Sequence, residues 1–403
     1  MGFLAALDRG PSARAALEAM SGAPAQVIAR APGRVNLIGE HTDYNGGAVL
    51  PVALPHATWA VAAVRTDGRV RVRSLQRRHD EVAVELPSVA ACGPGLSPTW
   101  AGYAVGVLWT LARAGVPVPG LDLVVDSTVP LGAGLSSSAA LECAVGAAVL
   151  GVLGRPVAGA DADLLVDAAV AAEQQVVGAP TGGMDQAVAV HGRAGHAVHL
   201  DFATGAAAAR RLVALPLHER GLALLVTDTR VAHALADGGP DAEPVGYAAR
   251  RADCEEAARL LGVPSLREAV PDAVEALPDG RPRRRARHVV SETARVAAFV
   301  AALERDDRRE LGRLLAGSHA SLRDDMEVSC PELDLAVTAA TGAGALGARM
   351  TGGGFGGSTV ALVDEQSLGQ VAAAVDEAFE REGLAAPQHL VVEASDGASW
   401  SPV

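Results

Sequence analysis

One segment constrains the fold of this chain more than any other, the run from residue 121 to residue 152. It starts as the apolar, strand-like LDLVVDSTVP, passes through LGAGLSSS and continues as a long alanine-rich helical pattern. Such a loop places the amides of Gly134 to Ser138 at a helix N-terminus, where unpaired N–H groups and the helix dipole bind anions. The alternative is a serine N-cap after a tight turn. Three consecutive serines exceed what one cap requires, so we predict an anion-binding loop.

The sequence contains no lysine, so each of its 34 Lys-or-Arg side chains is an arginine. A P-loop enzyme needs a lysine on the β- and γ-phosphates, and a protein kinase needs a strand lysine on the α- and β-phosphates. Both classes are therefore excluded, as is Schiff-base chemistry. A loop that holds a triphosphate in this chain has to do so with backbone N–H groups.

Strand-like and helical patterns are interleaved along the chain, which predicts an α+β protein. Its 403 residues exceed what one hydrophobic core usually spans, so we expect two domains, residues 1–195 and residues 196–403. Strands are predicted at residues 26–39, 48–66, 69–75, 121–130, 195–202, 222–230 and 388–395, and after the glycines that end near residue 357. Helices are predicted at residues 99–115, 136–154, 161–178, 246–262, 289–307, 307–325 and 365–383.

The net charge and the absence of targeting signals indicate which kinds of binding partner and which cellular location to expect. The net charge of −13 argues against nucleic-acid or anionic-membrane binding, which requires a positive surface. The first residues lack the features of a secretory signal, and the longest apolar run, residues 143–154, is too short to span a bilayer. The cysteines form no close pair, which argues against a zinc cage or a disulfide framework. We therefore expect a cytoplasmic protein that takes small molecules as partners.

Residues 30–47, RAPGRVNLIGEHTDYNGG, concentrate arginines, carboxylates and a histidine beside a turn signal. The pair Asn45–Gly46 is typical of a tight hairpin turn between two strands. If it forms that turn, these two residues have a structural role, and the charged residues before them need another explanation.

Two carboxylates flank a glycine-rich bend in residues 173–186, EQQVVGAPTGGMDQ. Glu173 ends an apolar helical pattern, and Asp185 follows the bend. The functional interpretation is a metal ligand and a catalytic acid or base. The alternative is a solvated helix end followed by an N-cap aspartate.

Residues 350–358, MTGGGFGGS, are dense in glycine, which indicates positive φ angles or a close approach of the backbone to another group. The run superficially matches the dinucleotide-binding pattern GxGxxG. That pattern needs a helix after the glycines, whereas an apolar strand-like stretch follows here, so we discount NAD or FAD binding.

Three other patterns carry weaker signals. The histidines at positions 191, 196 and 199 have no adjacent carboxylate or cysteine pattern that would favour a metal site. The basic run 281–288 is short and lies in an acidic protein, where it is typical of a solvated helix start. The paired aspartates 324–325 suit helix capping as well as chemistry.

Together these motifs resemble a known family. GRVNLIGEHTDYNGG is similar to the galactokinase signature, VPLGAGLSSSAALE resembles the phosphate loop of the wider GHMP sugar and isoprenoid kinases, and MTGGGFGGSTVALV resembles their third motif. The likeness extends over nearly the whole chain. It implies a two-domain GHMP kinase fold, with an N-terminal ribosomal-S5-like mixed sheet, a C-terminal ferredoxin-like sandwich and an active site in the cleft between them.

The resemblance also implies roles for individual residues. Arg34 and Asp185 match the family's catalytic pair. Positions that match sugar contacts are Glu40, His41, Asp43, Gly182 and Tyr247. Positions that match the ATP-binding loop are Gly132, Gly134, Leu135, Ser136, Ser137 and Ser138, with Trp100 near the adenine. Ser138 and Glu173 match the Mg²⁺ positions.

The implied reaction is transfer of the ATP γ-phosphoryl group to the C1 hydroxyl of α-D-galactose. Such a transfer depends on alignment and charge stabilisation, and Asp185 could act either as a base or as an electrostatic stabiliser. Two alternatives stay open: a GHMP kinase for another sugar, such as N-acetylgalactosamine or arabinose, and a non-catalytic sensor of galactose and ATP. We expect a monomer, and we expect residues 237–245 to form a surface loop near the sugar pocket.

Overall fold

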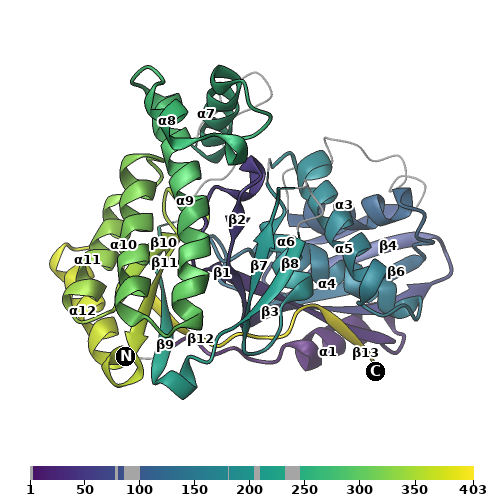
Figure 1. Cartoon of the computed structure of the whole chain (residues 1–403). Coiled ribbons are helices and arrows are strands. Elements are labelled where there is room, and N and C mark those ends of the chain that lie inside the picture. Colours follow the sequence, from purple (N-terminus) through teal and green to yellow (C-terminus); the bar gives the residue numbers. More distant parts are fainter. Residues whose placement is uncertain (1–2, 78–79, 86–99, 180, 204–208, 232–245) are drawn as a thin grey trace.

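The computed structural model describes residues 3–77, 80–85, 100–179, 181–203, 209–231 and 246–403 of the chain. Within these residues the strands form three sheets, and helices cover the faces of the two larger ones. Figure 1 shows the two larger sheets on opposite sides of the molecule, each with its own helices. The predicted α+β class is confirmed.

The first sheet has six strands in the order β13-β1-β3-β6-β4-β5. The bounds are Ser399–Pro402 for β13, Val27–Asn36 for β1, Pro51–Arg65 for β3, Gly120–Ser127 for β6, Arg69–Ser74 for β4 and Glu81–Glu85 for β5. Helix α1 (Gly10–Ser21) packs on one face of this sheet. The other face carries α3 (Trp100–Arg113), α4 (Ser137–Val152), α5 (Gly159–Ala172) and α6 (Met184–His191).

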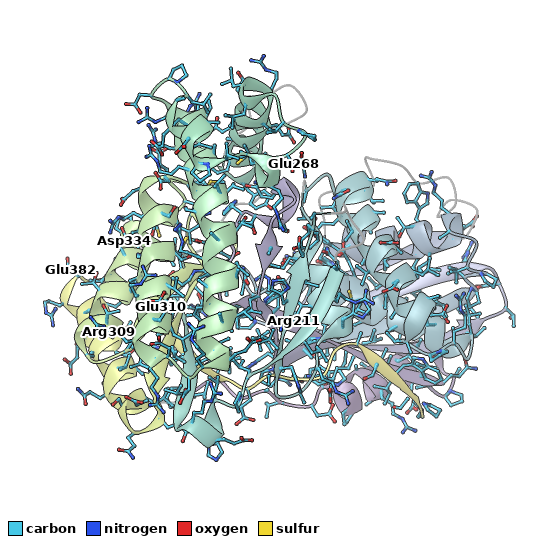
Figure 2. All side chains as sticks on the ribbon, viewed as in Figure 1. Arg211, Glu268, Arg309, Glu310, Asp334 and Glu382 are labelled. Atoms are coloured by element: carbon cyan, nitrogen blue, oxygen red, sulfur yellow. The ribbon has the colours of Figure 1, made fainter. Side chains whose placement is uncertain are left out.

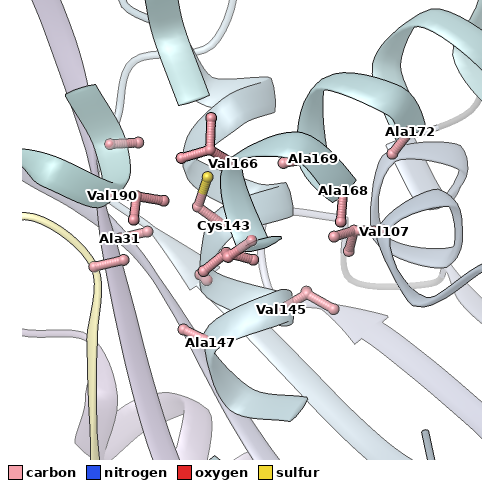
Figure 3. Packing of buried hydrophobic residues seen from close by; sticks show 14 of the residues in the cluster. Ala31, Val107, Cys143, Val145, Ala147, Val166, Ala168, Ala169, Ala172 and Val190 are labelled. Carbon is pink, nitrogen blue, oxygen red and sulfur yellow. The ribbon is translucent and has the colours of Figure 1, made fainter. Parts of the chain in front are cut away.

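Small apolar side chains fill the core between this sheet and its helices. Figure 3 shows alanines and valines, among them Ala147, Val166 and Ala169, packed around Cys143. Short side chains let α4 lie close to the sheet and to its neighbouring helices, so nearly all of α4 is buried. The N-terminus of α4, where the predicted anion-binding loop ends, is therefore held by a rigid core.

The second large sheet has the order β10-β11-β9-β12, with bounds Gly347–Thr351, Ser358–Asp364, Leu222–Asp228 and Gln388–Val392. Both of its faces are covered, which explains why every residue of β9 is buried. The long helices α9 (Arg281–Glu304) and α10 (Arg308–Asp324) pack on one face, and α11 (Pro331–Gly342) and α12 (Leu368–Arg381) on the other. Beyond α9 lie α7 (Gly246–Leu261) and α8 (Pro271–Glu275). Charged side chains such as Arg309 and Glu382 point outward in Figure 2.

A small third sheet contains β2 (Ala48–Val49), β7 (His196–Asp201) and β8 (Ala209–Ala214). β2 belongs to the connection between β1 and β3, so this sheet attaches directly to the segment 37–50. The C-terminal strand β13 pairs with β1, so the last residues of the chain return to the first sheet. No helix in the described part of the chain is both long and apolar enough to cross a membrane.

Three local predictions need correction. Asn45 and Gly46 do not form a two-residue hairpin turn: residues Asp43–Asn45 make a 3-10 turn, and Gly46 ends it in the left-handed region, with φ of 72°. The Asn45 amide instead donates a hydrogen bond to the His41 carbonyl, at 2.8 Å. The glycine run 352–357 is preceded by a strand, β10, which the sequence did not predict. The predicted closing strand β12 is followed by β13.

Candidate active site

A pocket brings together every residue predicted as catalytic or as a sugar contact. Its lining comes from four segments of the chain: the end of β1 and the loop after it, the bend before α6, the start of α7, and the glycines after β10. The predicted residues that line it are Arg34, Glu40, His41, Asp43, Gly182, Asp185 and Tyr247. The first and last of these positions, Arg34 and Tyr247, are more than two hundred residues apart in the sequence, so the fold alone brings them together.

Arg34 and Asp185 form a bidentate ion pair in this pocket. The Arg34 Nε lies 2.7 Å from Asp185 Oδ1, and Nη2 lies 2.9 Å from Oδ2. The third guanidinium nitrogen, Nη1, donates to the Gly134 carbonyl at 2.6 Å, which joins the pair to the loop before α4. Burial lowers the pKa of Arg34, but the carboxylates of Asp185 and Glu40 outweigh it and raise the pKa above its ordinary value. Arg34 is therefore a fixed positive charge.

A glycine lets strand β1 approach the loop before α4, and a serine hydroxyl joins the same loop to Asp185 of α6. A Cβ at Gly33 would lie 2.6 Å from the Leu135 carbonyl oxygen, which accepts a hydrogen bond from the Arg34 N–H at 3.1 Å. Ser136 Oγ donates to Asp185 Oδ2 at 2.5 Å. Asp185 thus accepts hydrogen bonds from Arg34 and from the phosphate-loop motif together, which orients its carboxylate.

Glu40, His41 and Asp43 lie on the connection after β1. His41 is neutral, because burial first, and then the nearby His288 and arginines, lower its pKa to about 3. Its Nε2 lies 3.2 Å from the Gly353 carbonyl, which only accepts, so Nε2 carries the proton and Nδ1 accepts from Tyr44 Oη at 2.9 Å. Burial, followed by the charge of Asp185, raises the pKa of Asp43 to about 6.

Gly182 and Tyr247 complete the wall of the pocket. A Cβ at Gly182 would lie 2.2 Å from Asp43 Oδ2, so only glycine allows the bend before α6 to approach Asp43. The ring of Tyr247 lies 5.2 Å from His41 and 5.5 Å from Tyr44, between ring centroids. These three rings form an aromatic corner that suits the apolar face of a small polar ligand.

The residues predicted to bind ATP follow one another at the start of α4. Gly132, Gly134 and Ser136 have φ of 74°, 71° and 58°, respectively, which turns the chain tightly before the helix begins at Ser137. The glycine run after β10 packs against this loop, since a Cβ at Gly352 would lie 2.8 Å from the Gly134 carbonyl oxygen. Leu135 is buried beneath the loop. The first N–H groups of α4 are available to an anion.

Trp100 begins α3 and lies in a separate hollow beside the loop. This hollow is lined by Trp100, Leu131, Leu141 and Ser137, together with residues of β3, β4 and β6. Leu131 is a large apolar side chain at this hollow and is 63% exposed. An apolar, flat ligand group would cover it here, next to Ser137 of the loop.

Ser138 and Glu173, the predicted Mg²⁺ positions, are in contact. Ser138 Oγ donates to Glu173 Oε1 at 3.0 Å, while Thr181 and Gln186 donate to Oε2. Glu173 is 3% exposed, and burial and the charge of Asp185 raise its pKa to about 7. One carboxylate and one hydroxyl suit Mg²⁺, which completes its shell with water and phosphate oxygens. No group of at least three His, Cys, Asp or Glu side chains among the described residues could hold a metal ion alone.

Several residues around these positions were not predicted. Tyr44 contacts His41, and Glu142, fully buried on α4, is linked to Glu173 through the amide of Gln186. Arg349 lies beneath Glu40, at 3.3 Å. Tyr44, Glu142 and Gln186 occur inside the motifs, where a buried polar residue on a helix or turn could have signalled them. Arg349 lies in the strand that the sequence analysis missed.

The weaker candidates have structural explanations or lie elsewhere. Arg285 of the basic run 281–288 is fully buried and ion-paired with Asp253 and Glu327. Residues 324–325 close α10 through hydrogen bonds from Arg323 and Ser321. The histidines at 191, 196 and 199 lie outside the pocket lining. The segment 237–245 lies outside the described residues.

Comparisons with known proteins agree with this arrangement. Residues 17–64 match the galactokinase galactose-binding signature, residues 102–193 match the GHMP kinases N terminal domain, and residues 299–381 match the GHMP kinases C terminal domain. The predicted GHMP kinase fold is therefore confirmed.

Curated relatives and solved structures extend the match to almost the whole chain. A galactokinase of Streptomyces coelicolor is 45% identical over 382 residues, covering 94% of this chain and 95% of the relative. The Homo sapiens galactokinase is 44% identical over 360 residues, covering 87% of each. The structure of Lactococcus lactis galactokinase complexed with galactose superimposes with a TM-score of 0.87 at 30% identity, over 96% of this chain and 98% of that one. A mevalonate kinase, at 15% identity and a TM-score of 0.65, shares the fold.

Proposed function

The chain belongs to the galactokinase family of the GHMP kinases, and from this premise we infer how its residues carry out the family's reaction. It is an ATP-dependent sugar kinase that phosphorylates galactose. The reaction transfers the γ-phosphoryl group of ATP to the C1 hydroxyl of α-D-galactose, and its products are galactose 1-phosphate and ADP.

The observation that carries the mechanism is the ion pair between Arg34 and Asp185, anchored on the loop by Gly134 and Ser136. We propose that the C1 hydroxyl donates a hydrogen bond to Asp185, which accepts its proton or stabilises its loss. Arg34 orients the Asp185 carboxylate through its bidentate contact and neutralises charge on the phosphoryl group as it transfers. Because phosphoryl transfer has little covalent chemistry for the protein to perform, alignment of these groups supplies most of the catalysis.

Glu40, His41, Asp43, Gly182 and Tyr247 are proposed to hold the sugar. The carboxylates accept hydrogen bonds from hydroxyl groups, and the aromatic corner takes an apolar face of the ring. A site with buried carboxylates discriminates strongly against a ligand that lacks a hydroxyl, because the carboxylate is then left unpaired.

ATP and Mg²⁺ are proposed to bind beside this sugar site. The backbone of residues 132–138 holds the phosphates at the N-terminus of α4, and Trp100 lies where the adenine would bind. Ser138 and Glu173 would hold Mg²⁺, which neutralises phosphate charge when bound. Glu173 is oriented for this role by Thr181 and Gln186.

The remaining proposals concern the setting of the enzyme. We propose a cytoplasmic monomer that divides near residue 195 and takes only small-molecule partners; the net charge of −13 supports the absence of a nucleic-acid partner. The strand β13, which pairs with β1, then belongs with the N-terminal part.

The test is an ADP-release assay with D-galactose, glucose, N-acetylgalactosamine, talose and arabinose, with the phosphorylated carbon identified by NMR. We expect galactose to be among the best substrates and the product to be the 1-phosphate. A preference for N-acetylgalactosamine or arabinose would instead identify a GHMP kinase for another sugar. Binding of galactose and ATP without ADP release would identify a sensor.

A further inference from the structure

Arg349, in the middle of β10, is a fully buried arginine beneath the sugar pocket. Its Nη1 donates to the Asn36 carbonyl at 2.8 Å, while its Nη2 lies 3.3 Å from Glu40 Oε1. Its Nε and Nη2 have no hydrogen-bond partner in the described part of the chain. A buried guanidinium whose Nε has no partner and whose Nη2 has an ion pair but no hydrogen bond is a poor way to stabilise a fold, since a buried charge needs full compensation. The position of Arg349 therefore calls for a reason other than stability.

The neighbouring carboxylate supplies that reason. Glu40 is 2% exposed and lines the pocket. Thr351 Oγ1 donates to Glu40 Oε1 at 2.9 Å, and the Gly352 N–H donates to the same oxygen at 2.7 Å. Arg349 also faces Oε1. Among the described residues all of these contacts meet on one oxygen, which leaves Oε2 for a ligand hydroxyl.

The backbone around Glu40 is fixed as well. His288 Nε2 donates to the Glu40 carbonyl at 3.0 Å, and the adjacent Gly39 N–H donates to Glu292 Oε1 at 3.0 Å. Both partners come from α9, whereas Arg349 comes from β10. The backbone at Glu40 is thus held by α9 and its carboxylate by residues 349–352, among which Arg349 provides the positive charge.

We propose that Arg349 is a positioning residue for the sugar, which holds Oε1 of Glu40 so that Oε2 accepts a hydrogen bond from a sugar hydroxyl. This inference rests on the proposed function, in which Glu40 contacts galactose. Arg349 acts through Glu40 and does not touch the ligand. Its removal therefore weakens galactose binding only while residue 40 is a glutamate.

A double-mutant cycle tests this dependence. Arg349→Met and Glu40→Gln are made singly and together, and the galactose dissociation constant is measured by titration calorimetry, with kcat and the KM for each substrate. We expect R349M to weaken galactose binding about tenfold to hundredfold, as for a lost charge-assisted contact, and to change the KM for ATP by less than about threefold. In the E40Q background we expect R349M to change galactose binding by less than about threefold.

Two further variants control for effects of the substitutions on folding. Arg71→Met removes an arginine that is ion-paired with the buried Asp122 on the first sheet, and we expect its galactose affinity to equal that of the parent. Arg349→Lys keeps the charge but loses the planar guanidinium group. We expect it to weaken galactose binding less than R349M does, and again only when residue 40 is a glutamate. If R349M does not fold, R349K and its double variant with E40Q complete the cycle.

Two results overturn the inference in different ways. Equal losses of galactose affinity in the parent and E40Q backgrounds, or an equal loss of ATP affinity, show that Arg349 does not act through Glu40, while the proposed function stands. Unchanged galactose affinity in E40Q alone removes the sugar contact of Glu40 itself, and with it the premise of the inference.

Discussion

Replacing Asp43 with asparagine should stabilise the ligand-free protein at neutral and alkaline pH. Asp43 lies in the sugar pocket, where burial and then the charge of Asp185 raise its pKa from 3.8 to about 6. Hydrogen bonds from the N–H groups of Tyr44 and Met184 oppose this rise without cancelling it. Above about pH 6 the Asp43 carboxyl of the folded protein is ionised, and its burial then costs free energy that an exposed carboxylate in the unfolded chain does not pay.

The size of the effect follows from the pKa. At about 1.4 kcal/mol for each tenfold change in the acid constant, a rise from 3.8 to about 6 corresponds to about 3 kcal/mol. Asparagine is nearly isosteric, but its amide accepts only one of the two backbone hydrogen bonds, which removes about 1 kcal/mol. Asp43 is also partly exposed, and water screens its charge. We therefore expect Asp43→Asn to gain about 1–2 kcal/mol in free energy of unfolding at pH 8.

The pH dependence distinguishes this cause from others. A carboxyl whose pKa is raised on folding contributes stability below its unfolded pKa, and that contribution is lost as the pH rises through its folded pKa. The difference between D43N and the parent should therefore be absent or negative near pH 4, should grow as the pH rises from about 4 to about 6, and should level off above pH 7.

The assay is urea unfolding without sugar, at pH steps from 4 to 8, with the variant and the parent compared at each step. Asp201→Asn is a control of opposite sign. Burial opposes the ionisation of Asp201, but hydrogen bonds from Arg267 and from the Ala203 N–H outweigh it and lower its pKa. D201N should therefore be less stable than the parent at pH 8, where D43N should be more stable. A D43N variant that is less stable than the parent at pH 8, or whose difference does not vary with pH, would refute the reasoning.

Three other substitutions give distinct outcomes. Asp185→Asn should lower kcat about 10²- to 10⁴-fold while calorimetric binding of an ATP analogue persists; near-normal ADP release would remove Asp185 from its role. Gly182→Ala, whose Cβ would meet Asp43 Oδ2 at 2.2 Å, should weaken galactose binding at least about tenfold, whereas Gly342→Ala, with open space around it, should not; equal affinities would contradict the steric argument. Burial first, and then the charge of Glu173, raise the pKa of Glu142, so the melting temperature of Glu142→Gln relative to the parent should rise as the pH is raised from 4 to 9; a difference that does not vary with pH would contradict this.

The sequence predicted most of the fold because local patterns and burial agree along most of it. The alanine-rich pattern at 136–154 became α4, bounded by Ser137 and Val152, because the glycines before it can turn and the helix is buried on nearly all sides. The catalytic, sugar, ATP and Mg²⁺ positions were found from motifs whose spacing reflects the family. Their roles stay predictions, although their positions in the pocket agree with them.

The errors occurred where long-range contacts override local preference. Asn45–Gly46 is a strong hairpin signal, yet the strands that flank it in space pair at Asn36 and Pro51, far from that pair of residues. The Asn45 side chain is used to hold the His41 carbonyl. β10 was missed because the strand has only five residues, contains Gly347 and an arginine, and leads directly into the glycine run. Nothing local indicates that Arg349 is buried, since its partner Glu40 is three hundred residues away.

The charges in the pocket explain why its carboxylic acids are kept although burying them lowers the stability of the folded protein. Among the described residues that line it, Arg34 is the only arginine, whereas Glu40, Asp43 and Asp185 are carboxylic acids. Burial, and then the charge of Asp185, raise the pKa of Asp43. The hydroxyl groups of galactose would donate hydrogen bonds to these carboxylates without adding charge. An anionic nucleotide adds negative charge instead, so its phosphates need the N–H groups at the start of α4 and a bound cation. The two substrates are thereby separated by chemistry as well as by position.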